Sequence, residues 1–244
     1  MPETLITLTP EQAATLVAQT DATDLKHDAR SHVRRVTDAQ GNPWVVKTFL
    51  HARWKQRFTQ KIGQHPAQLE ARWHANLQKA NVPVVPIAAQ GFDHSGAGWI
   101  ITPWMGESLH NTLAQGHADT PAQRHRLTRA VGTLTGRLLS QKLFNRDHKA
   151  SNIVIDPHSG ELRLIDAGGC RSAKGRPLLL SALPMLSNLN NALSTAATRH
   201  PRPHQARPSR ADRLRFLRSV YAAWPTPPDG LQHLLRHDAF DTPS

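Results

Sequence analysis

The sequence predicts an α+β fold, with a small antiparallel sheet in its N-terminal part and a mostly helical C-terminal part. Three observations lead to this prediction. Runs of β-branched and aromatic residues occur before residue 104. Apolar residues at helical spacing dominate after residue 120. No repeated strand–helix–strand unit, which would indicate a parallel sheet, is visible.

The N-terminal part contains signals for a helix, a hairpin, a second helix and two further strands. Thr9 and Pro10 have the residue types of a helix cap and a first-turn proline. Residues 38–43 have turn chemistry and separate two strand-like runs, as in a hairpin. Apolar residues three and four positions apart predict the second helix. The expected elements are a helix Pro10–Gln19, strands His32–Thr37 and Trp44–Phe49, a helix Pro66–Ala80, and strands Val82–Gln90 and Gly98–Pro103.

The C-terminal part is predicted to be helical apart from one short hairpin. A long helix opens at Thr120 and Pro121. Two short strands then flank a turn at residues 157–160, and the two last helices are separated by a segment rich in proline and arginine. The expected elements here are strands Ile153–Ile155 and Leu162–Ile165, helices Leu178–Ala197 and Arg210–Ala223, and an exposed loop Arg199–Ser209.

The chain is strongly basic. Its 244 residues include 30 Lys and Arg against 18 Asp and Glu, which gives a formal net charge of +12 at pH 7. This charge indicates an anionic partner: nucleic acid, an anionic membrane surface or a phosphorylated substrate. Nucleic acid is unfavoured, because stacking platforms need aromatic side chains among the basic ones, and only 5% of the residues are aromatic.

Composition also points to a compartment. No apolar stretch approaches the roughly 20 residues needed to cross a bilayer, and the first residues lack the features of a secretory signal. Cys170 is the single cysteine, so an intramolecular disulfide or a cysteine-based zinc site is excluded. We therefore expect a cytoplasmic protein.

The most informative stretch, residues 145–168, contains the groups that phosphoryl transfer needs. Asp147 can orient and deprotonate an acceptor hydroxyl, while Asn152 and Asp166 are oxygen ligands suited to Mg²⁺. The Asp-x-x-x-x-Asn spacing keeps Asp147 and Asn152 on one loop, and the following hairpin returns Asp166 to it. Lys149 can neutralise charge on the transferred phosphoryl group.

This stretch resembles the catalytic and metal-binding loops of the protein-kinase-like superfamily. Asn145-Arg146-Asp147 stands in place of His-Arg-Asp, and Asp166-Ala167-Gly168 in place of Asp-Phe-Gly. Upstream, Val45-Val46-Lys47 looks like the strand lysine that contacts the α and β phosphates, and Glu70 lies on the helix where the glutamate partner of that lysine belongs. The four elements occur in the chain order of that superfamily.

The resemblance implies a two-lobed protein-kinase-like fold with ATP and Mg²⁺ as cofactors. The N-lobe would span residues 1–102 and the C-lobe residues 109–244, joined by a hinge at 103–108. The backbone at Pro103, Trp104 and Met105 would contact adenine. One departure is clear: there is no glycine before Gly41, so residues 28–31 stand where protein kinases have a glycine-rich phosphate loop. Weak ATP affinity is therefore expected.

Within this superfamily the chain is most similar to the bacterial lipopolysaccharide core kinases, which phosphorylate Kdo or heptose. The similarity rests on residues 68–86, on residues 209–221 and on the lack of a long activation segment. It implies an anionic glycolipid substrate. The arginine cluster between Arg199 and Arg218 is either a solvated face or a surface that faces the phosphates and carboxylates of lipopolysaccharide or an anionic inner membrane. Two alternatives stay open: a kinase for a small metabolite, antibiotic or protein, and a catalytically silent kinase-like binding module.

Overall fold

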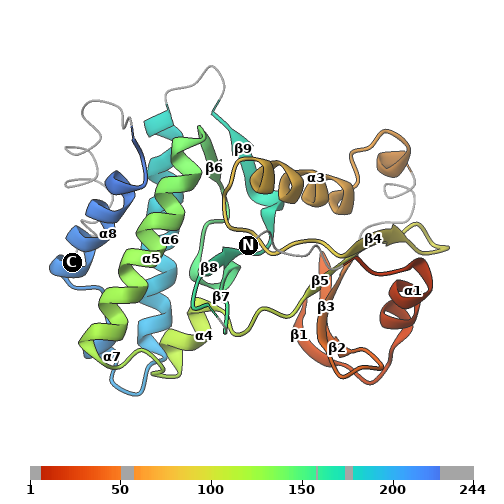
Figure 1. The fold of residues 1–244 in the computed structure, drawn as a ribbon, viewed down its shortest axis with the longest axis horizontal. Helices are drawn as coiled ribbons and strands as arrows, with labels where there is room; N and C mark the ends of the chain where they lie inside the picture. Colours follow the sequence, from red (N-terminus) through yellow and green to blue (C-terminus); the bar gives the residue numbers. More distant parts are fainter. Residues whose placement is uncertain (1–6, 51–57, 158, 174–177, 226–244) are drawn as a thin grey trace. The chain divides into compact units, whose positions relative to one another are not determined.

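The computed structural model describes residues 7–50, 58–157, 159–173 and 178–225. Its architecture is α+β: a five-stranded antiparallel sheet in the N-terminal part is followed by a largely helical region (Figure 1). This confirms the predicted fold class at that level. The chain forms two compact units, one of Met1–Gln78 with Val84–Trp104 and the other of Lys79–Pro83 with Met105–Ser244.

The sheet of the N-terminal unit has the order β1-β2-β3-β5-β4, and every neighbouring pair is antiparallel. Its strands are β1 Thr23–His27, β2 Ser31–Thr37, β3 Pro43–Phe49, β4 Ala89–Phe92 and β5 Gly98–Pro103. The β2–β3 hairpin and β5 confirm three predicted strands. The strand predicted at Val82–Gln90 is wrong for most of its length, because Pro83 and Pro86 lack the N–H that a ladder requires and pairing begins only at Ala89.

Two helices pack with side chains of this sheet, α1 Pro10–Ala18 and α3 Pro66–Lys79. Trp44 and Val46 of β3 belong to the hydrophobic cluster that contains the buried residues of α1. Phe49, on the opposite face of β3, packs with Ala67 of α3. Since side chains alternate along a strand, Lys47 shares the face of Phe49 and is directed to the α3 side.

The C-terminal unit consists mainly of helices. They are α4 Leu109–Ala114, α5 Pro121–Ser140, α6 Leu178–Thr198, α7 Pro203–Ala206 and α8 Arg210–Ala222. A side chain at Gly132 or Gly136 of α5 would collide with the backbone of α8 at Phe216 or Val220, so these glycines allow the two helices to pack closely. Within the described residues, no helix is both long and apolar enough to span a membrane.

Two short antiparallel ladders lie in the same unit. Strand β7 Ile153–Ile155 pairs with β8 Leu162–Leu164, as predicted. Strand β6 Leu143–Asn145 pairs with β9 Cys170–Ser172 and was not predicted. The predicted exposed loop at Arg199–Ser209 is wrong in part, because it contains α7 and a buried His200, whose Nε2 lies 2.6 Å from Oδ1 of Asp119.

Candidate active site

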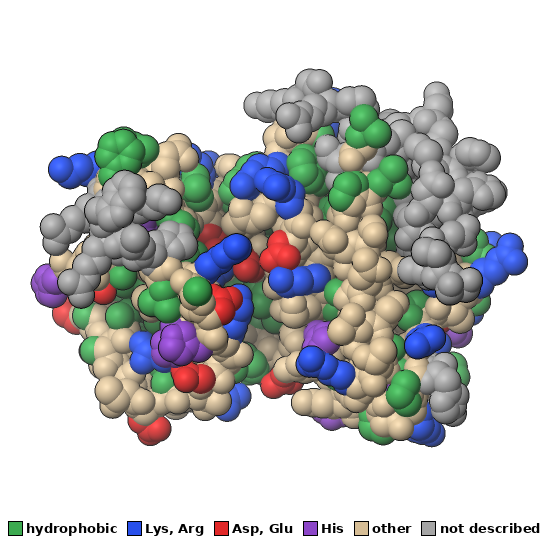
Figure 2. Space-filling model, turned by 180° about the vertical axis from the view of Figure 1, so that it is seen from behind, with side chains coloured by type: hydrophobic (Ala, Val, Ile, Leu, Met, Phe, Trp, Pro, Cys, Tyr) green, Lys and Arg blue, Asp and Glu red, His purple; other side chains and the backbone are tan. Residues whose placement is uncertain are grey.

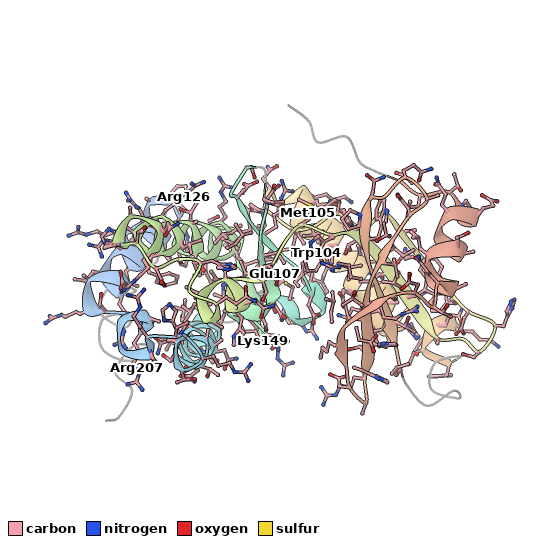
Figure 3. All side chains as sticks on the ribbon, turned by 90° about the horizontal axis from the view of Figure 1, so that it is seen from below. Trp104, Met105, Glu107, Arg126, Lys149 and Arg207 are labelled. Carbon is pink, nitrogen blue, oxygen red and sulfur yellow. The ribbon has the colours of Figure 1, made fainter. Side chains whose placement is uncertain are left out.

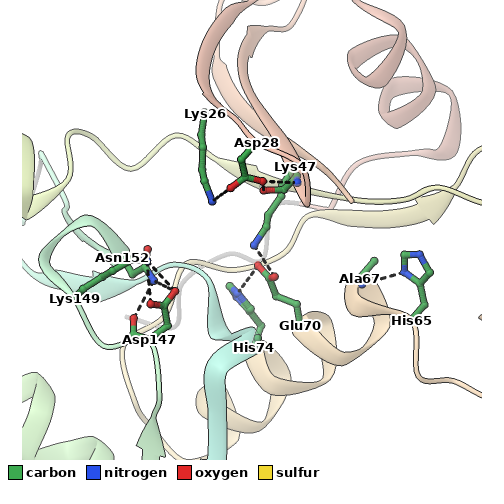
Figure 4. Close-up of polar contacts among 12 residues, drawn as sticks. Lys26, Asp28, Lys47, His65, Ala67, Glu70, His74, Asp147, Lys149 and Asn152 are labelled. Atoms are coloured by element: carbon green, nitrogen blue, oxygen red, sulfur yellow. Dashed lines mark hydrogen bonds and ion pairs between the residues drawn. The ribbon is translucent and has the colours of Figure 1, made fainter. Parts of the chain in front are cut away.

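In the N-terminal unit, Lys47 of β3 forms an ion pair with Glu70 of α3 (Figure 4). The Nζ atom lies 2.7 Å from Oε2, and the two side chains are only 15% and 4% exposed. The ammonium also lies 5.0 Å from the centre of the Phe49 ring, an attractive cation–π distance. Shielding from water strengthens such a pair and fixes the position of the lysine.

His74 extends this pair by one helical turn. It lies four residues after Glu70 on the buried face of α3, and its Nε2 is 4.0 Å from Oε1 of that carboxylate. Its Nδ1 donates a hydrogen bond of 2.8 Å to the carbonyl of Val85. His74 was not predicted as a site residue from the sequence, although its i+4 spacing from Glu70 places both residues on one helical face.

The turn between β1 and β2 contains residues 28–31, which were expected in the place of a glycine-rich loop. One carboxylate oxygen of Asp28 accepts the backbone N–H groups of Arg30 and Ser31, both at 2.8 Å. The other lies 2.7 Å from Nζ of Lys26. Hydrogen bonds from Lys26 and from these two N–H groups keep the pKa of Asp28 well below its usual value. The turn therefore forms an anion site that its own carboxylate fills.

In the C-terminal unit, the loop after β6 is held by Asn145. The Asn145 side chain is fully buried, and its Oδ1 accepts the backbone N–H of Asp147 at 3.0 Å. The backbone N–H of Arg146 donates to the carbonyl of Gly169 at 3.1 Å. A Cβ at Gly169 would overlap Oδ1 of Asn145 and lie 3.2 Å from Cβ of Asp147, so this contact requires glycine.

Asp147, Lys149 and Asn152 form a compact polar cluster on this loop (Figure 4). The Asn152 amide nitrogen donates to the Asp147 backbone carbonyl at 2.9 Å and to its Oδ2 at 3.1 Å. Lys149 places Nζ 2.9 Å from Oδ1 of the same carboxylate. The Asp147 side chain is 47% exposed, so its carboxylate is accessible to an acceptor while its contacts with Asn152 and Lys149 fix its orientation.

Asp166 follows β8 in the left-handed conformation, with φ 55° and ψ 65°. This region is uncommon for residues other than glycine, and aspartate is among the few that enter it. The N–H of the preceding Ile165 donates to the backbone carbonyl of Asn152 at 3.0 Å, which ties the start of the Asp166 loop to the Asn152 loop.

The donor chemistry of Asn152 and Asp166 fits magnesium. Asn152 uses its amide nitrogen on Asp147, so its carbonyl oxygen is the group left for a cation. Mg²⁺ typically takes one or two protein oxygens and completes its shell with water and phosphate oxygens. In the part of the chain that the structure describes, no group of three His, Cys, Asp or Glu side chains forms a self-sufficient metal site. A cation held by Asn152 and Asp166 would complete its shell with water and phosphate oxygens.

His148 follows Asp147 in the chain, and its side chain is fully buried. Its Nε2 is 3.1 Å from the hydroxyl of Thr135, and burial lowers the pKa of the ring to about 4. The neutral ring is therefore a packing group that supports the loop from α5.

The predicted adenine-contacting segment begins at the end of β5: Trp104 is the last residue of the N-terminal unit, and Met105 and Glu107 belong to the C-terminal unit (Figure 3). The Trp104 N–H donates to the carbonyl of Pro43 at 3.0 Å, and the Arg35 guanidinium lies 5.2 Å from the centre of its ring. Pro103 has no N–H to offer. Of these three positions, Met105 is the one at which an N–H contact to a base would be expected.

Comparison with known proteins adds no relative: no family model matches the chain, and no curated protein matches it. The structure brings Lys47 together with Glu70 in one unit, and Asp147 together with Lys149 and Asn152 in the other.

Proposed function

We propose that this chain is an ATP-dependent, Mg²⁺-dependent phosphotransferase with a protein-kinase-like fold. The N-terminal unit would be its small lobe and the C-terminal unit its large lobe. The proposed reaction transfers the γ-phosphate of ATP to a sugar hydroxyl of the lipopolysaccharide core, on Kdo or heptose.

The observation that carries the proposal is the closed loop from Asp147 to Asn152. Asn152 bonds both the backbone and the carboxylate of Asp147, which presents an exposed carboxylate in a fixed orientation next to an amide oxygen suited to Mg²⁺. A general base and a metal ligand held on one loop match the needs of phosphoryl transfer, in which positioning and electrostatics supply most of the rate.

Each residue has a distinct role in the proposed reaction. Asp147 accepts the proton of the acceptor hydroxyl. The hydroxyl oxygen forms a bond to the γ-phosphorus, and the bond from the γ-phosphorus to the oxygen bridging the β and γ phosphates breaks, so that ADP leaves. Lys149 stabilises charge on the transferred group. Lys47, held by Glu70, contacts the α and β phosphates. Bound Mg²⁺ would neutralise phosphate charge, with Asn152 and Asp166 as its protein ligands.

The charge of the C-terminal region supports an anionic acceptor. Among the arginines between residues 199 and 218, Arg202 pairs with Asp119 and Arg215 pairs with Asp212. Four others are exposed, namely Arg199, Arg207, Arg210 and Arg218. Lys and Arg side chains are also prominent on the face shown in Figure 2. Such a surface favours phosphates and carboxylates of a glycolipid at the cytoplasmic side of a membrane.

The test is phosphate transfer from labelled Mg·ATP to extracted lipopolysaccharide, to small sugars and to a panel of proteins. We expect label on lipopolysaccharide, and we expect Asp147→Ala to lower its rate by about 10²- to 10⁴-fold, the usual size of a general-base contribution. Asp93→Ala, in an exposed turn of the other unit, is the matched carboxylate control. Asp166→Ala should abolish Mg²⁺-dependent nucleotide binding.

The other outcomes distinguish the alternatives. Label on another acceptor alone would retain the mechanism and replace the substrate. Absence of both label and nucleotide binding would favour a silent binding module. The Asp28 carboxylate supports this alternative, because it already accepts the backbone N–H groups of the β1–β2 turn.

A further inference from the structure

Two of the most exposed large hydrophobic side chains lie next to each other in the N-terminal unit. Phe58 is 62% exposed and Ile62 is 53% exposed. Residues 58–61 are helical, and the N–H of Ile62 donates to the carbonyl of Phe58 at 3.3 Å. The two side chains are therefore one helical turn apart on the same side of the backbone. Exposed apolar groups rimmed by polar residues can mark contacts with proteins or membranes.

Two cations lie beside this pair. Lys61 lies between the two residues and is exposed, and Arg72 of α3 reaches across to donate to the carbonyl of Gly63 at 3.0 Å. The sequence contains no Asp or Glu from residue 39 to residue 69. Its Lys and Arg residues over that range are Lys47, Arg53, Lys55, Arg57 and Lys61. The apolar pair thus stands in an acid-free, basic part of the chain.

We propose that Phe58 and Ile62, flanked by Lys61 and Arg72, form a docking site for the surface of an anionic phospholipid bilayer. A bilayer surface presents acyl carbon and negative headgroups within a few ångströms of depth, and a helical turn with apolar side chains beside cations matches both. A protein partner would have to cover two apolar side chains together with two neighbouring cations. This site is distinct from the C-terminal arginines, and it does not depend on the proposed phosphotransfer.

The test is co-sedimentation of the full chain with vesicles of phosphatidylcholine alone or of equal parts phosphatidylcholine and phosphatidylglycerol. We expect binding to the anionic vesicles and little binding to the neutral ones. The double variant Phe58→Ser/Ile62→Ser should weaken binding by about tenfold or more, because it removes the inserted side chains. Lys61→Glu/Arg72→Glu should weaken it as well, and salt should weaken wild-type binding.

The matched control is Leu25→Ser/Leu180→Ser, which removes two other exposed hydrophobic side chains outside the arginine-rich C-terminal segment. It should bind like the wild type. Failure of the wild type to bind anionic vesicles would overturn the proposal, as would equal binding by the Phe58/Ile62 variant. Sedimentation equilibrium supplies a further check, because a dimer that dissociates only in that variant would make the patch a contact between copies of the chain and would also overturn it.

Discussion

The ammonium group of Lys149 lies 2.9 Å from Oδ1 and 3.0 Å from Oδ2 of Asp147, so one cation contacts both oxygens of the proposed base. Both side chains are substantially exposed, at 39% and 47%. Ion pairs with this exposure are screened by water and contribute little to stability. The ammonium group of Lys149 can therefore leave the Asp147 carboxylate and bind a more highly charged phosphoryl group instead.

Lys149→Met is expected to lower kcat by about 10²-fold, the size observed when one charge-stabilising donor is removed from a transition state. The affinity for Mg·ATP should change little, because Lys149 acts on the transferred group. Steady-state kinetics with calorimetric nucleotide binding separates the two effects. Arg129→Met, which removes an exposed cation from α5, is the control. An unchanged kcat in the Lys149 variant would contradict its assigned role.

Asp28→Ala is expected to tighten Mg·ATP binding by about tenfold, because it removes a negative charge from an N–H pair that can hold phosphate. Ser31, at the end of this turn, pairs with Phe49, and Val33 pairs with Lys47. The turn therefore lies two residue pairs away from Lys47 along the β2–β3 ladder. Asp93→Ala is the matched control, since Asp93 accepts the N–H groups of Ser95 and Ala97 in the β4–β5 turn. Calorimetry measures both, and weaker binding by the Asp28 variant would mean that its carboxylate supports the turn instead of excluding phosphate.

The parts of the fold that were predictable are those whose interactions are local in sequence. The β2–β3 hairpin has turn residues between two strand runs, and α5 begins at a capping box of Thr120 and Gln123. The cluster of Asp147, Lys149 and Asn152 is equally local, because the hydrogen bonds among these three residues span at most five positions. Pattern and spacing therefore sufficed to select Asp147 and Asn152 as neighbours.

The missed elements depend on partners distant in the sequence. Strand β6 is only three residues long and exists because Asn145 pairs with Cys170. Strand β1 is exposed at every position, so it has no hydrophobic alternation to detect. At Val82, Val84 and Val85 a strand was predicted where the structure has none. These side chains are buried because they pack in the interior, not because they belong to a sheet. The need for glycine at position 169 is also invisible without knowledge that Asn145 lies against it.

Gly169→Ala is expected to destabilise the protein by about 1–3 kcal/mol, the usual range for an overpacked interior. The added Cβ overlaps Oδ1 of Asn145, and the backbone N of Asp147 is 3.1 Å away, so kcat should fall as well. Urea unfolding and kinetics measure the two effects. In an Asn145→Ala background the stability cost should be smaller, because the main obstacle is gone. Equal costs in both backgrounds would contradict the proposed overlap.

The pH dependence of stability is expected to depend on His148, which is fully buried in the C-terminal unit. The Thr135 hydroxyl donates to the carbonyl of Val131 at 2.8 Å, so at its contact with His148 it accepts a hydrogen bond from Nε2–H. Nδ1 then carries the lone pair, and it has no hydrogen-bond partner among the described residues. Protonation would place an unpaired charge in the interior, and burial accordingly lowers the pKa of His148 from 6.5 to about 4.

A histidine with a lowered pKa in the folded state binds its proton more readily when unfolded, so acid favours unfolding. The stability that neutral His148 permits is fully present above pH 6.5 and is lost as the pH falls towards 4, a loss of about 3 kcal/mol from this residue. Urea unfolding of the wild type and of His148→Gln, whose amide can still donate to Thr135, should diverge over this interval. The free energy of unfolding of the variant should fall less steeply with acid, and parallel curves would show that His148 is not the residue that titrates.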